Sequence, residues 1–227
     1  MICENLKNIR GEIADAAERS GRDPADIQLL AVSKRMDTSK IQEAYECGHL
    51  VFGENFIQEA REKIGRLDKS ISWHFIGHLQ SNKAKIAAQL FQVIETVDRL
   101  KVARALNKHA ADLGKFLDIL VQINIGREEQ KSGVYPQDAE QFIRKVGTLQ
   151  NLRVRGLMIM PPFSSDPEKA RPYFRALKKM ADQFQKQGYF ADEYPVVLSM
   201  GMTNDFTVAI EEGSTLVRVG TAIFGKR

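Results

Sequence analysis

The sequence has few cysteines and no long apolar run, and both absences limit what the protein can be. Cys3 and Cys47 are its two cysteines in 227 residues, and neither belongs to a paired Cys/His pattern. A disulfide framework and a zinc site are therefore not expected. No apolar stretch approaches the roughly 20 residues that cross a bilayer, and the charged N-terminus lacks the apolar centre of a signal peptide. We expect a cytoplasmic protein without a membrane partner.

Basic residues are not concentrated in any segment. Lysine and arginine total 33 against 29 aspartates and glutamates, for a net charge of +4. No basic run alternates with aromatic residues, as it does in many nucleic-acid-binding segments. A solvated surface of mixed charge is expected rather than a nucleic-acid-binding face, and the modest positive charge suits a small phosphorylated ligand.

Linkers rich in proline or glycine are also missing, so residues 1–227 are expected to form a single domain. Short apolar runs alternate with longer segments of helical periodicity, which is typical of parallel β/α units. These runs predict eight strands, at 27–33, 50–52, 72–75, 91–95, 117–124, 153–159, 195–200 and 215–220.

Eight such strands predict an α/β fold, a (β/α)8 barrel of the TIM type, for which this length is near the compact end of a range of roughly 200 to 400 residues. Helices are predicted to start at Asp37 and Asp98 and to span 167–187. An extra N-terminal helix over 3–19 is expected to close the ring, because little chain follows the eighth strand. The alternative, a doubly wound open sheet, needs a glycine-rich turn after the first strand, and "AVSKRMD" has none.

Polar residues follow several predicted strands, at the end where the chemistry of such barrels takes place. In strand order they are Lys34, Glu54, Asn55, His74, Asn124, Ser199, Gly201, Arg218, Gly220 and Thr221. Because the strands of a parallel barrel run the same way, these residues are expected to converge on one face.

The last two loops predict a phosphate site, because barrels often bind phosphate after strands seven and eight and at the start of a short extra helix. "SMGMTND" supplies the hydroxyl of Ser199 and an exposed glycine backbone at Gly201. "GTAIFG" places Gly220 and Thr221 at the start of a terminal helical turn, where N–H groups favour an anion. Plain turns are the alternative interpretation of these glycines.

Lys34 is the candidate reactive residue. A lysine that rises into a barrel mouth is partly desolvated, which lowers the pKa of an ammonium and exposes an amine that forms Schiff bases with carbonyl groups. Opposite a phosphate site, this amine suits either a class I aldolase acting on a sugar phosphate or the capture of pyridoxal 5′-phosphate (PLP).

Arg218 favours PLP over a sugar phosphate. It lies among Leu216, Val217 and Val219, so it is expected to face inward and to need a partner. One interpretation is a buried ion pair with a carboxylate. The other is a contact with the PLP ring nitrogen, which a permanently charged guanidinium keeps unprotonated. An aldolase needs no such residue.

Seven motifs from about residue 5 to the end of the chain resemble one known family. They are "LLAVSK", "FGENFIQEAREKI", "WHFIGHLQSNK", "INIGREEQKSGV", "RGLMIMPP", "LSMGMTNDF" and "VRVGTAIFGKR". On these motifs the chain resembles the PLP homeostasis protein family. The resemblance implies a fold-type III PLP barrel similar to the N-terminal domain of alanine racemase, with the cofactor held as a Schiff base.

The resemblance also implies residue roles. Lys34 would be the Schiff-base lysine and Arg218 would face the ring nitrogen. Ser199, Gly220 and Thr221 would hold the phosphate. The full set of expected cofactor-binding residues is Lys34, Asn55, His74, Ser199, Gly201, Arg218, Gly220 and Thr221. Thr203 stands where the family more often has serine, a change that keeps the hydroxyl.

We expect a binding protein rather than an enzyme. Chemistry on a PLP adduct needs positioned acid–base groups, and related racemases take a tyrosine from a separate C-terminal β domain. That domain is expected to be absent, since the chain stops at Arg227. The prediction is a monomer that buffers or delivers PLP and so affects amino-acid and keto-acid balance, with PLP-dependent apoenzymes as candidate recipients. The alternative is a PLP-dependent racemase or lyase.

Overall fold

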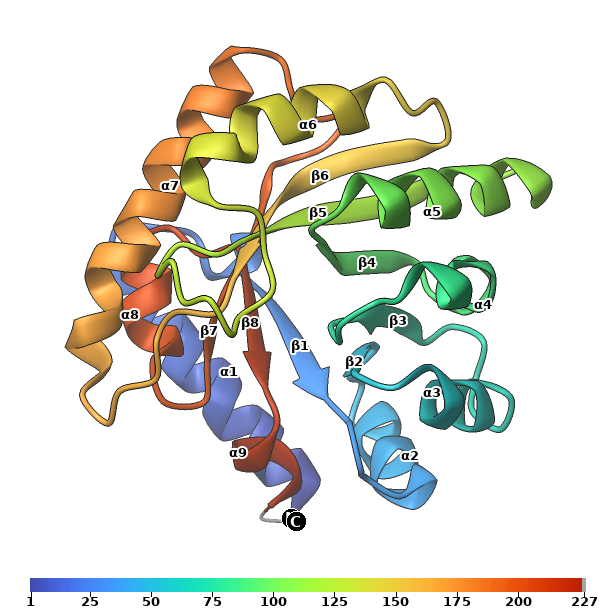
Figure 1. The fold of residues 1–227 in the computed structure, drawn as a ribbon. Helices are drawn as coiled ribbons and strands as arrows, with labels where there is room; N and C mark the ends of the chain where they lie inside the picture. Colours follow the sequence, from blue (N-terminus) through green and yellow to red (C-terminus); the bar gives the residue numbers. More distant parts are fainter. Residues whose placement is uncertain (226–227) are drawn as a thin grey trace.

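The computed structural model describes residues 1–225 and contains a closed barrel of parallel strands surrounded by helices (Figure 1). Neighbouring strands follow the chain order, and the last pairs with the first. The strands are β1 (Gln28–Val32), β2 (Val51–Glu54), β3 (Ser72–Phe75), β4 (Val93–Val97), β5 (Leu117–Ile123), β6 (Leu152–Ile159), β7 (Val197–Met202) and β8 (Leu216–Val219). The prediction of a (β/α)8 barrel is confirmed.

Helices alternate with the strands along the chain. They are α1 (Ile2–Arg19), α2 (Thr38–Glu46), α3 (Ile57–Ile64), α4 (Ala84–Leu90), α5 (Leu100–Asp112), α6 (Ala139–Gly147), α7 (Arg171–Lys186), α8 (Phe206–Glu211) and α9 (Thr221–Phe224). Short 3₁₀ turns are η1 (Pro24–Asp26), η2 (Ser81–Lys83), η3 (Pro136–Asp138) and η4 (Pro167–Ala170). In residues 1–225 no helix combines the length and the apolar character that a membrane span requires.

The N-terminal helix closes the ring as expected. Ile2, Leu6, Ile9 and Ile13 recur every three or four residues and are buried, so they form one apolar face. This face lets α1 pack against α2, α8 and α9. In Figure 1, α1 lies beside α8 and α9.

The strands are buried on both sides, so most of them appear in the sequence as short apolar runs. Leu30, Val32, Ile76 and Leu216 pack together as a small cluster separate from the main core. Their neighbours along the strands pack beneath the helices instead. Strands buried on both faces read as continuous apolar runs rather than as alternating patterns.

One of the two predicted helix caps is confirmed. The Asp37 carboxylate accepts a hydrogen bond from the Ser39 N–H at 2.9 Å, at the start of α2. The Asp98 cap was wrong, because α5 begins at Leu100 and Asp98 pairs with the Arg99 side chain at 3.0 Å instead.

A disulfide joins Cys3 of α1 to Cys47 at the end of α2, so the expectation of no disulfide was wrong. The two Cα atoms lie 5.4 Å apart, within the normal range for a disulfide. The cysteines are 44 residues apart in sequence. They meet because α1 packs on α2, a tertiary contact that cysteine spacing does not encode.

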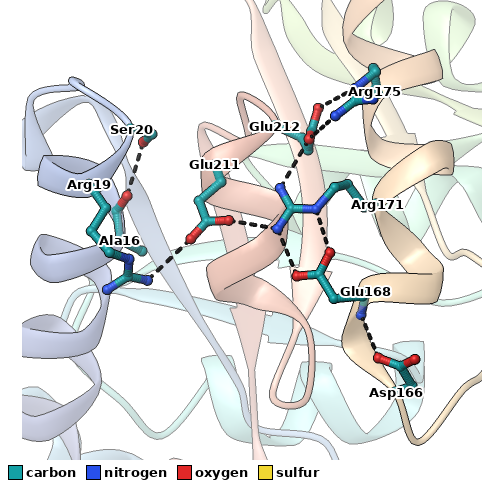
Figure 2. Close-up of polar contacts among 9 residues, drawn as sticks. All are labelled: Ala16, Arg19, Ser20, Asp166, Glu168, Arg171, Arg175, Glu211 and Glu212. Atoms are coloured by element: carbon teal, nitrogen blue, oxygen red, sulfur yellow. Dashed lines mark hydrogen bonds and ion pairs between the residues drawn. The ribbon is translucent and has the colours of Figure 1, made fainter.

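An ion-pair network ties together three elements on the outside of the barrel (Figure 2). Arg171, the first residue of α7, contacts Glu168 at 2.6 Å, Glu211 at 2.8 Å and Glu212 at 3.0 Å. Glu211 also contacts Arg19 of α1 at 3.3 Å. Arg171 thus links α7 to α8, and Glu211 extends the link to α1.

Candidate functional site

A cavity of about 150 Å³ opens at the carboxyl ends of the strands. Its lining residues are Val32, Lys34, Asn55, Ile76, Met158, Met160, Met202, Thr203, Arg218, Gly220 and Thr221. Five of the predicted site residues, Lys34, Asn55, Arg218, Gly220 and Thr221, therefore share one cavity. They come from the ends of β1, β2 and β8, which is where the barrel topology was expected to bring them.

Lys34 follows directly after β1. Ser33 is fully buried and its N–H donates to the Gly53 carbonyl at 3.0 Å, which continues the pairing with β2 for one residue. Lys34 is half-buried and lines the cavity. Arg35 then takes a left-handed backbone conformation, with φ of 60°, so the chain turns away from the barrel immediately after the lysine.

Gly220 and Thr221 begin the terminal turn α9. The Ile223 and Phe224 N–H groups both donate to the Gly220 carbonyl at 3.0 Å, and the N–H groups ahead of them have no acceptor within the helix. A Cβ on Gly220 would lie 3.2 Å from the Val32 carbonyl oxygen, so the turn sits close against the end of β1. The Thr203 hydroxyl-bearing side chain lines the same cavity.

A chain of buried hydrogen bonds lies beneath the cavity. Arg218 Nη1 donates to Ser199 Oγ at 2.5 Å, and Ser199 Oγ donates to Glu95 Oε2 at 2.5 Å. His74 Nδ1 donates to the other Glu95 oxygen at 2.7 Å. Arg218 Nη2 also donates to the Ile159 carbonyl at 2.8 Å. Arg218 is held by contacts on both ends of its guanidinium.

The surroundings of Glu95 favour its ionised form. Burial by itself raises the pKa of Glu95, but the hydrogen bond and electrostatic interaction with His74, together with the charge of Arg218, outweigh it and hold the pKa below its usual range. Burial lowers the pKa of Arg218, and the Glu95 and Asp205 carboxylates oppose that shift. Since a guanidinium stays protonated in proteins, Arg218 is a buried cation balanced by Glu95 through a serine hydroxyl.

Three predicted site residues do not line the cavity. His74 and Ser199 belong to the buried chain below it. Gly201 was expected to expose its backbone, but it is buried with φ of 92°, and a Cβ there would lie 2.6 Å from Ala209 Cβ. The pairing of β7 with β8 shifts register between Ser199 and Met202. Met202 and Thr203, which follow this shift in the chain, line the cavity.

Sequence reasoning missed Glu95 altogether. Strand four contributed no residue to the predicted site, yet it ends "FQVIE" with a carboxylate after four mostly apolar residues. A fully buried glutamate in that position needs a partner. The carboxylate at the end of an apolar run was therefore the feature of the sequence that could have identified Glu95. In residues 1–225 no group of three or more histidine, cysteine, aspartate or glutamate side chains is placed to hold a metal ion.

The chain is similar to known proteins along nearly its whole length. The family model described as alanine racemase, N-terminal domain, matches residues 5–227. The pyridoxal phosphate homeostasis protein of Aquifex aeolicus is 42% identical over 229 residues, which cover 99% of this chain and 98% of that protein. The chain belongs to the pyridoxal phosphate homeostasis protein family. The Escherichia coli K12 member is also 42% identical, over 100% of this chain and 97% of its own.

Solved structures support the same family. PipY of Synechococcus elongatus with PLP bound is 33% identical, has a TM-score of 0.86, and the match covers 99% of this chain and 100% of that one. An alanine racemase of Clostridium difficile has a TM-score of 0.74 at 16% identity, and the match covers 57% of that chain. The racemase therefore shares the fold of this family.

Proposed function

We propose that this protein binds PLP covalently through Lys34 and acts in PLP homeostasis, as a buffer or a delivery protein. The observation that carries the proposal is the cavity that brings Lys34, Arg218 and the Gly220–Thr221 turn together. The PLP-bound structure of PipY, a relative that this chain matches along its whole length, supports it.

The cavity residues suit the parts of PLP. The Asn55 Oδ1 atom is buried and, among the described residues, accepts no hydrogen bond, so it is available to a donor on a ligand. Thr203, Gly220 and Thr221 would hold the phosphate, and Arg218 would face the ring nitrogen. Bound PLP supplies an aldehyde, the group with which the Lys34 amine would condense.

Apolar residues suit the ring faces. Val32, Ile76 and Met158 line the cavity beside the polar groups. Ligand sites combine such apolar walls with a few placed polar groups. We infer that Ser199, expected to hold the phosphate, instead orients Arg218, because its hydroxyl is committed to Arg218 and Glu95.

We infer a binding role rather than catalysis. Among the residues that line the cavity, Lys34 and Arg218 are the titratable ones, whereas chemistry at the Cα of an amino acid needs further acid–base groups. The alternative, a PLP-dependent racemase or lyase, is favoured by the shared alanine racemase fold alone. The PLP-loaded protein is mixed with a panel of amino acids, and their chirality and any carbonyl products are followed. Turnover would support the enzyme alternative.

The proposal is tested by trapping the adduct. The purified protein is mixed with PLP, reduced with borohydride and mapped by mass spectrometry, alongside Lys34→Ala. We expect one reduced adduct, on Lys34, which is lost in the variant. An adduct distributed over surface lysines, or retained in Lys34→Ala, contradicts the proposal.

We also infer that the protein is a monomer in the cytoplasm and that PLP-dependent apoenzymes receive its cofactor. Light scattering tests the first inference. Transfer is tested by mixing loaded protein with an apoenzyme in the presence of a PLP scavenger. Because cytosolic thiols are mostly kept reduced, the location predicts that Cys3 and Cys47 react with an alkylating agent added to intact cells.

A further inference from the structure

A buried lysine that the proposed binding site does not use lies on α3. The Lys63 side chain is 6% exposed. Its Nζ atom donates to the Ser33 carbonyl at 2.7 Å, to Glu54 Oε1 at 2.8 Å and to Glu59 Oε1 at 2.6 Å. Three acceptors satisfy the three N–H bonds of an ammonium. Lysine is among the residues least often buried, so this arrangement calls for an explanation.

Stability gives a weak explanation for it. Taking charges out of water is costly, and well-packed apolar residues in place of a buried ion pair are often no less stable. Glu54 bears part of that cost, because burial raises the pKa of its carboxyl although hydrogen bonds from Lys63 and Ser33 oppose the shift. What the cluster provides is fixed geometry at the atoms it contacts.

Those atoms surround Lys34 in the chain. The Ser33 carbonyl, which Lys63 holds, belongs to the peptide group directly before Lys34. The Arg35 N–H belongs to the peptide group directly after it and donates to Glu59 Oε1 at 2.5 Å. Since Glu59 is itself paired with Lys63, both peptide groups that flank the Lys34 Cα are bound to one cluster.

The backbone there needs this support. Arg35 has φ of 60°, in the left-handed region that is unfavourable for a residue other than glycine. Such a conformation persists when surrounding contacts determine it. Glu54 adds a further contact, because its Oε1 atom accepts from Ser33 Oγ at 2.6 Å.

We propose that Lys63, together with Glu59, is a positioning residue that fixes the backbone on both sides of Lys34 and so sets the rate at which the Lys34 amine captures an aldehyde. The proposal rests on the proposed function. In the capture step, the unprotonated Lys34 Nζ forms a C=N bond with the aldehyde carbon as the C=O bond breaks. The two hydrogens of the amine pass to the aldehyde oxygen, which leaves as water. A fixed backbone keeps the amine in the geometry of attack rather than leaving it to search many orientations.

Two variants separate positioning from folding. Glu59→Ala removes the acceptor of the Arg35 N–H from a side chain that is 25% exposed, so the fold is expected to survive. The double variant Lys63→Met with Glu54→Gln removes the ammonium without leaving a buried carboxylate unpaired. The matched control is Lys178→Met, which breaks the 2.5 Å ion pair with Asp182 within α7.

Three measurements are made on each variant. Hydrogen exchange of the Arg35 amide is followed without PLP. The rate of PLP capture is followed by the visible band and by reduction to the Lys34 adduct. The affinity for inorganic phosphate, measured by its competition with PLP, reports on the Gly220–Thr221 side of the cavity. We expect the exchange rate of the Arg35 amide to rise at least tenfold and the rate of PLP capture to fall at least tenfold. Phosphate affinity should stay within twofold of the wild type, and the control should match the wild type in all three measurements.

The inference is overturned if Arg35 exchange or PLP capture is unchanged in both variants. It is also overturned if capture and phosphate affinity fall together, because that is the signature of a general loosening. Failure of the proposed function is a separate result: the wild type then forms no Lys34 adduct, although its Arg35 amide is protected.

Discussion

Reduction of the Cys3–Cys47 bond is expected to lower the free energy of unfolding by about 4 kcal/mol. The bond closes a loop with a sequence separation of 44 residues. In the chain-entropy model, opening a loop of this size returns about 13 cal/mol/K to the unfolded chain, or about 4 kcal/mol at 25 °C. Domains of this kind are stable by only about 5 to 15 kcal/mol, so the loss is large.

The effect is expected to arise in the unfolded chain, because other contacts also hold α1 in place in the folded state. The Ile2 N–H donates to Glu43 of α2 at 3.1 Å, and Asn5 Nδ2 donates to the Ile223 carbonyl of α9 at 2.8 Å. Urea unfolding followed by circular dichroism, with and without dithiothreitol, measures the difference. A Cys3→Ser/Cys47→Ser variant should have the same free energy of unfolding as the reduced wild type, and dithiothreitol should not change it. A difference below about 1 kcal/mol would refute the loop-entropy reasoning.

Three further predictions concern the folded state. Glu95→Ala leaves the Arg218 cation without its balancing charge and should lower the free energy of unfolding, measured in urea, by about 3 to 5 kcal/mol. Because the folded-state pKa of Glu95 is depressed, its contribution to stability is complete above the unfolded-state pKa and is lost as pH falls through the folded-state pKa. Glu95→Gln should therefore reduce the loss of stability at acid pH. Gly77→Ala would place a Cβ 2.0 Å from the Asn55 carbonyl oxygen, and a cost of about 3 kcal/mol is expected from the forced shift, with weaker PLP binding; an unchanged melting temperature would contradict it. Arg171→Ala removes the centre of the network in Figure 2, and a loss of about 1 kcal/mol that shrinks in 1 M NaCl is expected.

The barrel could be predicted because its strands are encoded by neighbouring residues in the sequence. Parallel strands that are buried on both faces appear as short, nearly continuous apolar runs. Barrel topology brings five of the eight predicted site residues to one cavity. Once the strands are parallel and closed, Lys34 after β1 and Arg218 in β8 must approach the same mouth, and both line the cavity.

What could not be predicted depends on contacts between distant elements. Ser199 is predicted to hold the phosphate because of its motif, whereas the structure shows its hydroxyl hydrogen-bonded to Glu95 of β4 and Arg218 of β8. Lys63 in "IQEAREKI" reads as a surface lysine with a Glu59 partner four residues earlier. Only the tertiary contact between Lys63 and the Ser33 carbonyl shows that this lysine is buried and reaches the end of β1.

The two buried charge clusters act at the end of β1 and in β8, which are neighbouring strands. Lys63 fixes the peptide groups around Lys34, and Glu95 and Ser199 fix the guanidinium of Arg218. Each cluster carries a desolvation cost that an apolar core would avoid. Under the proposed function, the site brings an amine and a cation to one small aldehyde. Groups that are already ordered lose little conformational entropy on binding, and this offsets part of the desolvation cost.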